Sequence, residues 1–546
     1  MVSGNDFILC SHSHLHALNR TSASQGGLLT LPSFIATFPS IDTTGQSGTS
    51  HAATLQGVAI GLYEIGCFIG AISCLWLGDM LGRRPIIWIG TILMIIGATV
   101  QCSSFSLAQL IIARIITGVG NGMHTATIPV WQSECSPPHK RGMLIMVEGA
   151  LITGGICMSY WIDFAFYWID PSSRNPEFDR ADLVNYPHAS ASWRVPIAFQ
   201  ILLCIPTFIT IWMPESPRWL LLKNREEDAR AVLASLDQVP LDDPVVELKI
   251  REIKDSIADA AGVGVADIFK QGKERNFHRT VLGFVIQMFQ QISGINLITY
   301  YAATIFQTNI GMSALVSRIV AAANGTEYFL ASWIAVFTIE RLGRRNLMVF
   351  SAVMMAVCMA ILTGTTSPAA LHPDASGEAQ NKKPAYVATV FLFLFNTFFA
   401  IGWLGMTWLY PAEITPLSIR AAANGISTSA NWLFNFMVVL ITPIAFSTIG
   451  YKTYLIFAVI NAAIAVTSYL VFPETAGRSL EEMDEIFAKS SYLNPYDVVK
   501  NERVQPRRYD TSGRLLALDN IISEDNKAAE KGDGVADDTV SSHSST

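Results

Sequence analysis

An apolar stretch in the middle of the chain, FVIQMFQQISGINLITYY (284–301), is rich in amide side chains. Its glutamines fall within one helical arc of about 100°: Gln287, Gln290 and Gln291. Asn296 and Tyr300 would lie on the opposite side of an unbroken helix. They can join the glutamines only if the helix breaks near Ser293–Gly294, as helices at mid-membrane do where they expose backbone to a ligand. Such a break would gather these side chains in one site.

Amides beside aromatic rings suit a neutral ligand with many hydroxyl groups, because amides both donate and accept hydrogen bonds while rings pack on C–H faces. Downstream, Trp408 precedes a second amide cluster, in which Asn431 and Asn435 share a helical face with Trp432 beside them. The alternative is that these amides only form hydrogen bonds between helices. Their density favours a binding site.

Two carboxylates lie inside apolar segments. Glu64 is about 20 Å from the cytoplasmic end of segment 54–77 at ~1.5 Å per residue, and Glu148 is roughly 10 Å inside segment 143–162. Ionisable groups at such depth usually face a bundle interior and take part in function. For Glu64, a hydrogen bond that only fixes packing is an equal alternative. Glu148 shares its helical face with small and polar residues, which favours a lined cavity over close packing.

One motif recurs in the second half of the chain. Glu134 and Arg141 reappear as Glu413 and Arg420, since 413 − 134 and 420 − 141 both equal 279. Two further pairs have similar offsets: LGDMLGRR (77–84) with IERLGRR (339–345), and PESPR (214–218) with PETAGR (473–478). Self-similarity at this long a period predicts two related halves and not a solenoid.

The basic residues of these motifs lie in alternate loops, which the positive-inside rule places in the cytoplasm. Segments 163–194 and 366–385 have few basic residues and are expected outside. The glycines of GVGNG (118–122) lie in an apolar segment, which predicts close helix packing and not a dinucleotide site. We assign gate or ion-pair roles to twelve charged residues: Asp79, Arg83, Arg84, Arg114, Glu134, Arg141, Glu340, Arg341, Arg344, Arg345, Glu413 and Arg420.

The composition is that of a membrane protein. Of 546 residues, 51% are hydrophobic and 15% charged, with a mean hydropathy of +0.36, whereas soluble domains have about 25% charged residues. Because spanning segments must satisfy their own backbone, we predict an all-α integral membrane protein. A span needs about 20 apolar residues, and the candidate runs are 54–77, 85–102, 107–130, 143–162, 195–213, 280–305, 314–339, 346–365, 386–411, 419–445 and 451–472.

Other functional classes find no support. The eight cysteines are scattered without metal-ligand or disulfide spacing. The sequence shows no nucleophile–base pair, no metal-ligand cluster and no phosphate loop. We therefore expect no enzymatic activity, no metal or cofactor, and no nucleic-acid partner.

We divide the chain into five regions. They are an atypical polar amino terminus (1–24), an amino-terminal bundle (25–213), a charged cytoplasmic linker (214–279), a carboxy-terminal bundle (280–472) and a cytoplasmic tail (473–546), largely disordered after about 490.

The amino terminus poses a topological problem. Residues 1–24 lack a secretory signal, and Leu28–Phe38 is too short to span a membrane. The basic loops place the end of segment 54–77 inside, so the preceding chain must begin outside, yet nothing before it can cross. We therefore expect that residues 1–24 are not the native start of a working protein, through a misplaced start or an intron boundary.

The motifs taken together resemble one family. Over about Gln25 to Lys489, the chain resembles the sugar porter family of the major facilitator superfamily. The motifs that carry the resemblance are GDMLGRR with ERLGRR, RxxxGxGxG, PVWQSE followed by RG, PESPRWL, QQISGIN followed by YY, and PETAGRSLEE. The residues within these motifs are most similar to those of fungal sugar and glycerol–proton symporters. The resemblance implies two six-helix bundles with alternating access, and cytoplasmic ion pairs that hold one conformation. It also implies a sugar site at Gln290, Gln291, Asn296, Tyr300, Trp408 and Asn431, with Trp432 nearby.

Two departures from the family matter. Glu148–Gly149 stands where sugar porters usually have Asn-Gln, so a sugar contact is missing and an acid is present. The family's Tyr-Asp-Gln-Gly-like motif is absent before Gly27, and with it the aspartate implicated in proton uptake. Glu148, or else Glu64, is then the candidate for proton coupling.

From these observations we expect a transporter of a neutral sugar or polyol in the plasma membrane, coupled to protons. One alternative is a carrier of a sugar-like secondary metabolite. Another is a nutrient sensor that binds without transport and signals through its tail.

Overall fold

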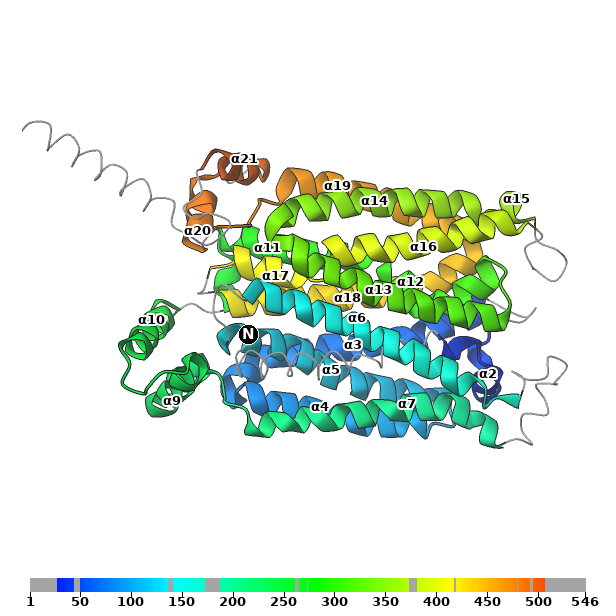
Figure 1. The fold of residues 1–546 in the computed structure, drawn as a ribbon, viewed down its shortest axis with the longest axis horizontal. Helices are drawn as coiled ribbons and strands as arrows, with labels where there is room; N and C mark the ends of the chain where they lie inside the picture. The colour runs from blue at the N-terminus through cyan, green and yellow to red at the C-terminus, as the bar shows by residue number, and fades with distance from the viewer. Residues whose placement is uncertain are drawn as a thin grey trace, which may run out of the picture.

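The computed structural model describes residues 27–43, 50–135, 141–171, 187–260, 265–272, 274–372, 381–416, 419–478, 480–491 and 494–505. All regular elements of this part of the chain are helical. Long helices run side by side, with the first half (blue to cyan) along one side and most of the second half (green to orange) along the other (Figure 1).

The first half begins with three short turns, followed by five long helical segments. The short turns are η2 (Leu28–Thr30), α2 (Pro32–Thr37) and η3 (Pro39–Ile41). The long segments are α3 (Ser50–Leu81), α4 (Arg83–Cys102), α5 (Leu107–Cys135), α6 (Arg141–Tyr167), and α7 (Ala191–Cys204), which η7 (Pro187–Ser190) precedes and η8 (Ile205–Trp212) continues.

The second half contains two segments that are each divided into consecutive helices. Its elements are α11 (Asn276–Ile292), α12 (Ile295–Thr304), η10 (Ile305–Asn309), α13 (Ala314–Leu342), α14 (Arg344–Thr365), α15 (Pro368–Leu371), α16 (Lys382–Gly402), α17 (Met406–Ile414), α18 (Arg420–Ile449) and α19 (Lys452–Val471).

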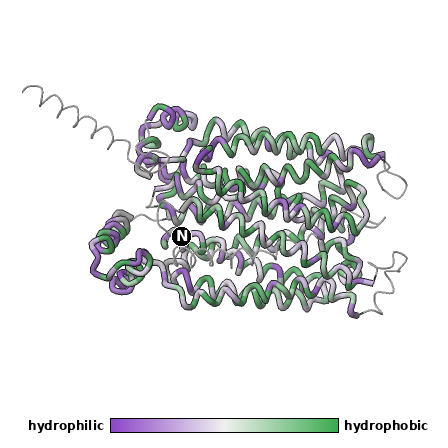
Figure 2. Tube along the Cα trace, in the orientation of Figure 1, coloured by the Kyte–Doolittle hydropathy of each residue, from purple (hydrophilic) through white to green (hydrophobic). Residues whose placement is uncertain are grey.

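Shorter helices gather at one end of the bundle (Figure 1). Figure 2 shows that hydrophilic residues concentrate there and at the opposite tips, while the long helices are largely hydrophobic. These shorter elements are α8 (Pro217–Leu222), α9 (Glu226–Asp237), α10 (Pro244–Ala260), η9 (Val265–Phe269), α20 (Leu480–Lys489) and α21 (Tyr496–Val504).

Helix α21 lies beyond residue 490, in the region that we expect to be largely disordered. Val498 and Val499 are fully buried, and Arg478 forms an ion pair with Glu502 at 3.1 Å. Apolar burial and this ion pair hold α21 against the described part of the chain. Residues 506–546 lie outside the described part.

Among the described residues, ten helical segments are long and apolar enough to cross a membrane: His51–Gly78, Arg83–Cys102, Met143–Tyr167, His188–Trp212, Asn276–Gln307, Ala314–Ile339, Arg344–Thr365, Lys382–Ile414, Ala422–Ile449 and Lys452–Val471. They correspond to ten of the eleven predicted spans. The eleventh, 107–130, lies in α5, which is long enough but is rich in polar residues such as Arg114, Asn121 and His124, all buried.

Helix α5 packs against both α3 and α4. A Cβ atom on Gly118 or Gly122 would collide with the backbone carbonyls of Tyr63 and Cys67 on α3. The glycines therefore serve close helix packing, as predicted.

The segment after residue 27 does not span the membrane. Helix α2 has only six residues. The rings of Phe34 and Phe38 pack edge-on against Trp193, with centroids 5.5 and 5.6 Å apart. Residues 1–24, which we expected not to be a native start, lie outside the described residues.

The two halves contact one another mainly where α3 meets α18 and α6 meets α13. A Cβ atom on Gly57 of α3 would lie 2.6 Å from the carbonyl oxygen of Leu440, and one on Gly61 would lie 3.0 Å from the Phe436 ring. Near the outer end, α3 and α18 therefore pack so closely that a side chain at Gly57 or Gly61 would have no space.

Candidate functional site

The predicted helix break is confirmed. Helix α11 ends at Ile292, α12 begins at Ile295, and Gly294 between them has φ +97°. This left-handed conformation favours glycine. The carbonyl of Ser293, freed by the break, accepts a hydrogen bond from Asn461 Nδ2 at 2.8 Å.

Two of the predicted glutamines form hydrogen bonds with the backbone at a second helix break, between α16 and α17. Gln290 Nε2 donates to the carbonyl oxygens of Trp403 and Leu404 at 3.0 and 3.1 Å. Gln287 Nε2 donates to the carbonyl of Thr407 at 2.9 Å. The Thr407 hydroxyl also donates to the Trp403 carbonyl, at 3.3 Å. The two glutamines thus stabilise the second break by supplying donors to its buried carbonyls.

The amides form a continuous hydrogen-bonded chain. Asn431 Nδ2 donates to Gln287 Oε1 at 2.6 Å and to Gln290 Oε1 at 2.7 Å. Gln291 Nε2 donates to Gln290 Oε1 at 3.2 Å. Asn296 Nδ2 in turn donates to Gln291 and, at 2.7 Å, to Asn435 Oδ1. Helices α11, α12 and α18 are joined by this chain.

These amides border a cavity of about 80 Å³ between the two halves. Small-molecule sites usually measure about 300–1,000 Å³, so the cavity is contracted and its amides bind one another. All seven residues predicted to bind substrate line it: Gln290, Gln291, Asn296, Tyr300, Trp408, Asn431 and Trp432. The prediction omitted other lining residues, including Tyr63, Asn121, Tyr328 and Asn435. Asn435 is predicted to share a helical face with Asn431 but is not included among the predicted substrate-binding residues.

A buried carboxylate is bonded to one side of the cavity. Tyr300 on α12 donates its hydroxyl to Glu64 Oε1 on α3 at 2.5 Å, and Glu64 is fully buried. This bond joins the two halves of the protein.

Arg114, for which a gate or ion-pair role is predicted, lies beside this pair. Its guanidinium is 5.4 Å from the centre of the Tyr63 ring and donates to the carbonyl of Ile60 at 3.0 Å. It also interacts electrostatically with Glu64 and Tyr300. Arg114 is seven residues from the outer end of α5, inside the predicted span 107–130.

Glu148 is buried, with 5% of its surface exposed. It is not among the residues that line the cavity. A Cβ on the neighbouring Gly149 would meet Leu404 at 3.5 Å and Gly405 at 3.7 Å, which places this face of α6 against the α16–α17 break. Its role in proton coupling remains a prediction.

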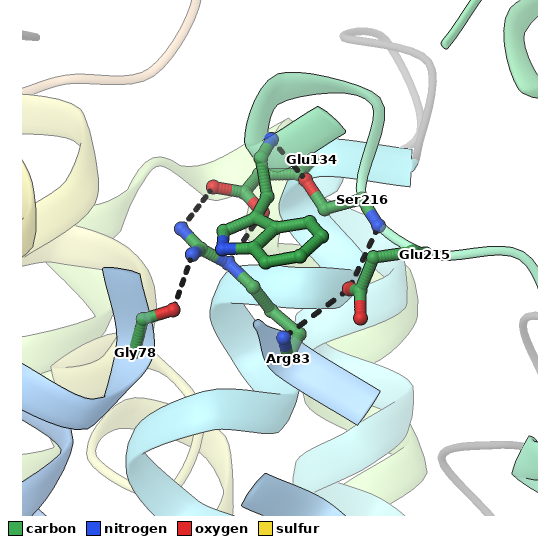
Figure 3. Close-up of polar contacts among 6 residues, drawn as sticks. Gly78, Arg83, Glu134, Glu215 and Ser216 are labelled. Carbon is green, nitrogen blue, oxygen red and sulfur yellow. Dashed lines mark hydrogen bonds and ion pairs between the residues drawn. The ribbon is translucent and has the colours of Figure 1, made fainter. Parts of the chain in front are cut away.

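The charged motifs form a network at the cytoplasmic end (Figure 3). Arg83 donates through Nη2 and Nε to both oxygens of Glu134, at 2.9 and 3.0 Å, and through Nη1 to the carbonyl of Gly78 at 3.0 Å. Such two-point pairs are stronger than single contacts. Glu215 accepts from the backbone nitrogens of Arg83 and Arg84, both at 3.2 Å, and so caps the start of α4.

The second half repeats this network. Arg344 donates to Glu413 at 3.1 Å, and Thr475 donates to the same carboxylate at 2.6 Å. Glu474 accepts from the backbone nitrogens of Arg344 and Arg345 at 2.8 and 3.0 Å, and so caps α14. Glu215 and Glu474 were not predicted, although their positions in PESPR and PETAGR signalled them.

The remaining charged residues differ in their surroundings. Arg84 donates to the carbonyl of Ile211 and lies 5.2 Å over the Trp88 ring. Arg345 donates to the carbonyl of Tyr469.

Arg420 donates to the carbonyl of Thr415 at 3.0 Å, and Arg341 is exposed. The side chains of Asp79, Arg141 and Glu340 lie outside the described residues.

Comparison with known proteins shows which family has this sequence and this architecture. A family profile described as "Sugar (and other) transporter" matches residues 21–487. The chain is 36% identical over 472 residues to the Sugar transporter STL1 of Saccharomyces cerevisiae, covering 85% of this chain and 77% of that protein. It is also 36% identical over 478 residues to the MFS-type transporter oryC of Aspergillus oryzae, covering 86% and 83%.

Among solved structures, the proton:xylose symporter XylE bound to 6-bromo-6-deoxy-D-glucose has the same fold, with a TM-score of 0.72 at 23% identity, covering 89% of this chain and 100% of that one. The relatives are transporters and not enzymes. The chain is an integral membrane protein that belongs to the sugar porter family of the major facilitator superfamily.

Proposed function

We propose that this protein carries a neutral sugar or polyol across the plasma membrane by alternating access, together with a proton. The observation that supports this most directly is the amide-lined cavity between the halves, with Glu64 bonded to its Tyr300. The lining combines amides and aromatic rings and includes no charged side chain among the described residues. Such a lining favours an uncharged hydroxylated ligand.

Substrate entry requires the amide chain to open. Gln291, Asn296 and Asn435 bond mainly to other amides. A sugar hydroxyl can replace one such amide, because it both donates and accepts. Gln290 is instead tied to two backbone carbonyls, so it positions the site as substrate binds.

The proton acts at the bond between Glu64 and Tyr300. An ionised Glu64 accepts the tyrosine hydroxyl more strongly than a protonated one, because charged hydrogen bonds are stronger. Protonation therefore weakens a contact between α3 and α12, and the two halves separate more easily. Since Tyr300 also lines the cavity, ligand occupancy and protonation are linked.

The test is uptake by purified protein in proteoliposomes with an imposed proton gradient. Labelled glucose, xylose and glycerol are compared with and without an uncoupler. We expect accumulation of at least one that the uncoupler abolishes. In Glu64→Gln, exchange of substrate across the membrane continues but accumulation is lost. Binding without any transport would favour the sensor, and gradient-driven accumulation by Glu64→Gln would contradict the coupling role.

A further inference from the structure

A second hollow lies between the two halves and opens on the membrane-facing side. Its volume is about 520 Å³, within the usual range for small-molecule sites of about 300–1,000 Å³. Trp161 on α6 forms one side, and residues of α13 and α16 form the rest, including Thr326, Glu327, Leu330, Ile334 and Thr397. Leu330 is 62% exposed and Ile334 is 43% exposed, so we call this the lateral groove.

The lateral groove holds a carboxyl group at the middle of the membrane. Glu327 lies about 20 Å from either end of α13 at ~1.5 Å per residue. Thr397 donates its hydroxyl to Glu327 Oε1. Oε2 is buried and has no hydrogen-bond partner among the described residues. Ionisable groups at this depth are rare and usually functional.

The rest of the lateral groove is apolar. Of the described residues that line it, none is basic. The Thr326 hydroxyl already accepts from Trp161 Nε1 at 2.9 Å and donates to the Ala322 carbonyl at 2.9 Å. Among the described lining residues, Glu327 Oε2 is the buried acceptor that has no hydrogen-bond partner.

We propose that the lateral groove binds a lipophilic alcohol from the membrane, with an apolar body and a single hydroxyl that donates to Glu327. The carboxyl must turn about its terminal bond to present Oε2, and this torsion is soft in glutamate. A neutral hydroxyl fits better than an ammonium group, because it brings no charge into the hydrocarbon. The ligand contacts α6 and α13, one helix from each half.

The lateral groove is separate from the central cavity. Tyr328, the residue after Glu327, lines the central cavity, whereas Glu327 lines the groove. Binding of the alcohol can therefore be measured whether or not the protein transports a sugar.

The experiment is photolabelling of the full-length protein in phosphatidylcholine nanodiscs. The probe is dodecanol bearing a diazirine, and its control is the same chain without the hydroxyl. Labelled peptides are mapped by mass spectrometry. We expect the alcohol to label the peptides around Trp161 and Leu330 about tenfold more than the alkane, the equivalent of about 1.4 kcal/mol.

Matched variants locate the site. Leu330→Trp fills the groove and should abolish labelling, whereas Phe337→Trp, on the same helix and 70% exposed outside the groove, should not. Glu327→Leu should lower labelling about tenfold, and Glu327→Gln should retain it, since it keeps an acceptor oxygen. Equal labelling by alcohol and alkane, or no effect of Leu330→Trp, would overturn the proposal. Stronger labelling by dodecylamine bearing the same diazirine would also overturn it.

Discussion

The sharpest test of the site is the contrast between two neighbouring glutamines. Among the described residues, the Gln291 side chain bonds to the side chains of Gln290 and Asn296, whereas Gln290 also donates to two backbone carbonyls. In Gln291→Ala, a ligand hydroxyl loses one hydrogen-bond partner, which weakens the binding free energy by about 1–3 kcal/mol. At 1.4 kcal/mol per decade, the dissociation constant should rise about five- to a hundredfold with little change in stability.

Gln290→Ala should behave differently. It removes the Gln290 donor from the buried carbonyls of Trp403 and Leu404, so the thermal midpoint of unfolding should fall as well as the affinity. Binding is measured by calorimetry on detergent-purified protein with the transported sugar, and stability by thermal unfolding. Unchanged affinity in Gln291→Ala, Asn296→Ala and Asn435→Ala would refute the assignment of the site.

Three further predictions concern coupling, gating and the cytoplasmic turns. If Glu148 is the proton carrier in place of Glu64, the variant Glu148→Gln will exchange substrate across the membrane but will not accumulate it. Full accumulation of substrate by this variant would show that Glu148 does not carry the proton. Arg420→Ala removes the bond to the Thr415 carbonyl and should lower the transport rate while leaving ligand affinity intact, so a loss of binding would argue against a gate. Gly343→Ala places a Cβ 2.6 Å from Glu474 Oε2 at φ +84° and should destabilise the fold by about 1–3 kcal/mol. Gly78→Ala, where a Cβ meets nothing within 4 Å, is its control, and equal thermal midpoints would disprove the strain.

Local sequence signals predicted most of the fold and much of the site. Gly294 after Ser293 located the helix break, because only a residue tolerant of positive φ ends the helix there. The repeated Arg and Glu positions predicted the duplicated cytoplasmic networks. Each of these signals lies within one short stretch of chain.

Contacts between distant segments were not predictable in the same way. The bond from Tyr300 to Glu64 joins residues 236 positions apart, and no periodicity specifies which helices meet. The position of Glu148 away from the cavity depends on the rotation of α6, which a polar stripe leaves undetermined. The partners of Arg114, the Tyr63 ring and the Ile60 carbonyl, lie on another helix and could not be predicted from its place in span 107–130.

The glycines at the junction of α3 and α18 bear on which changes this protein can tolerate in evolution. Under the alternating access that we propose, the outer junction must part. Gly57 permits it to close onto the Leu440 backbone, and Gly61 onto the Phe436 ring. A larger side chain at either position would act as a wedge that the closed form excludes and the open form accepts. Such a variant would fold and bind from outside, yet its population would shift toward the outward-open form. Selection at these positions would then act on turnover, in a region that touches neither sugar nor proton.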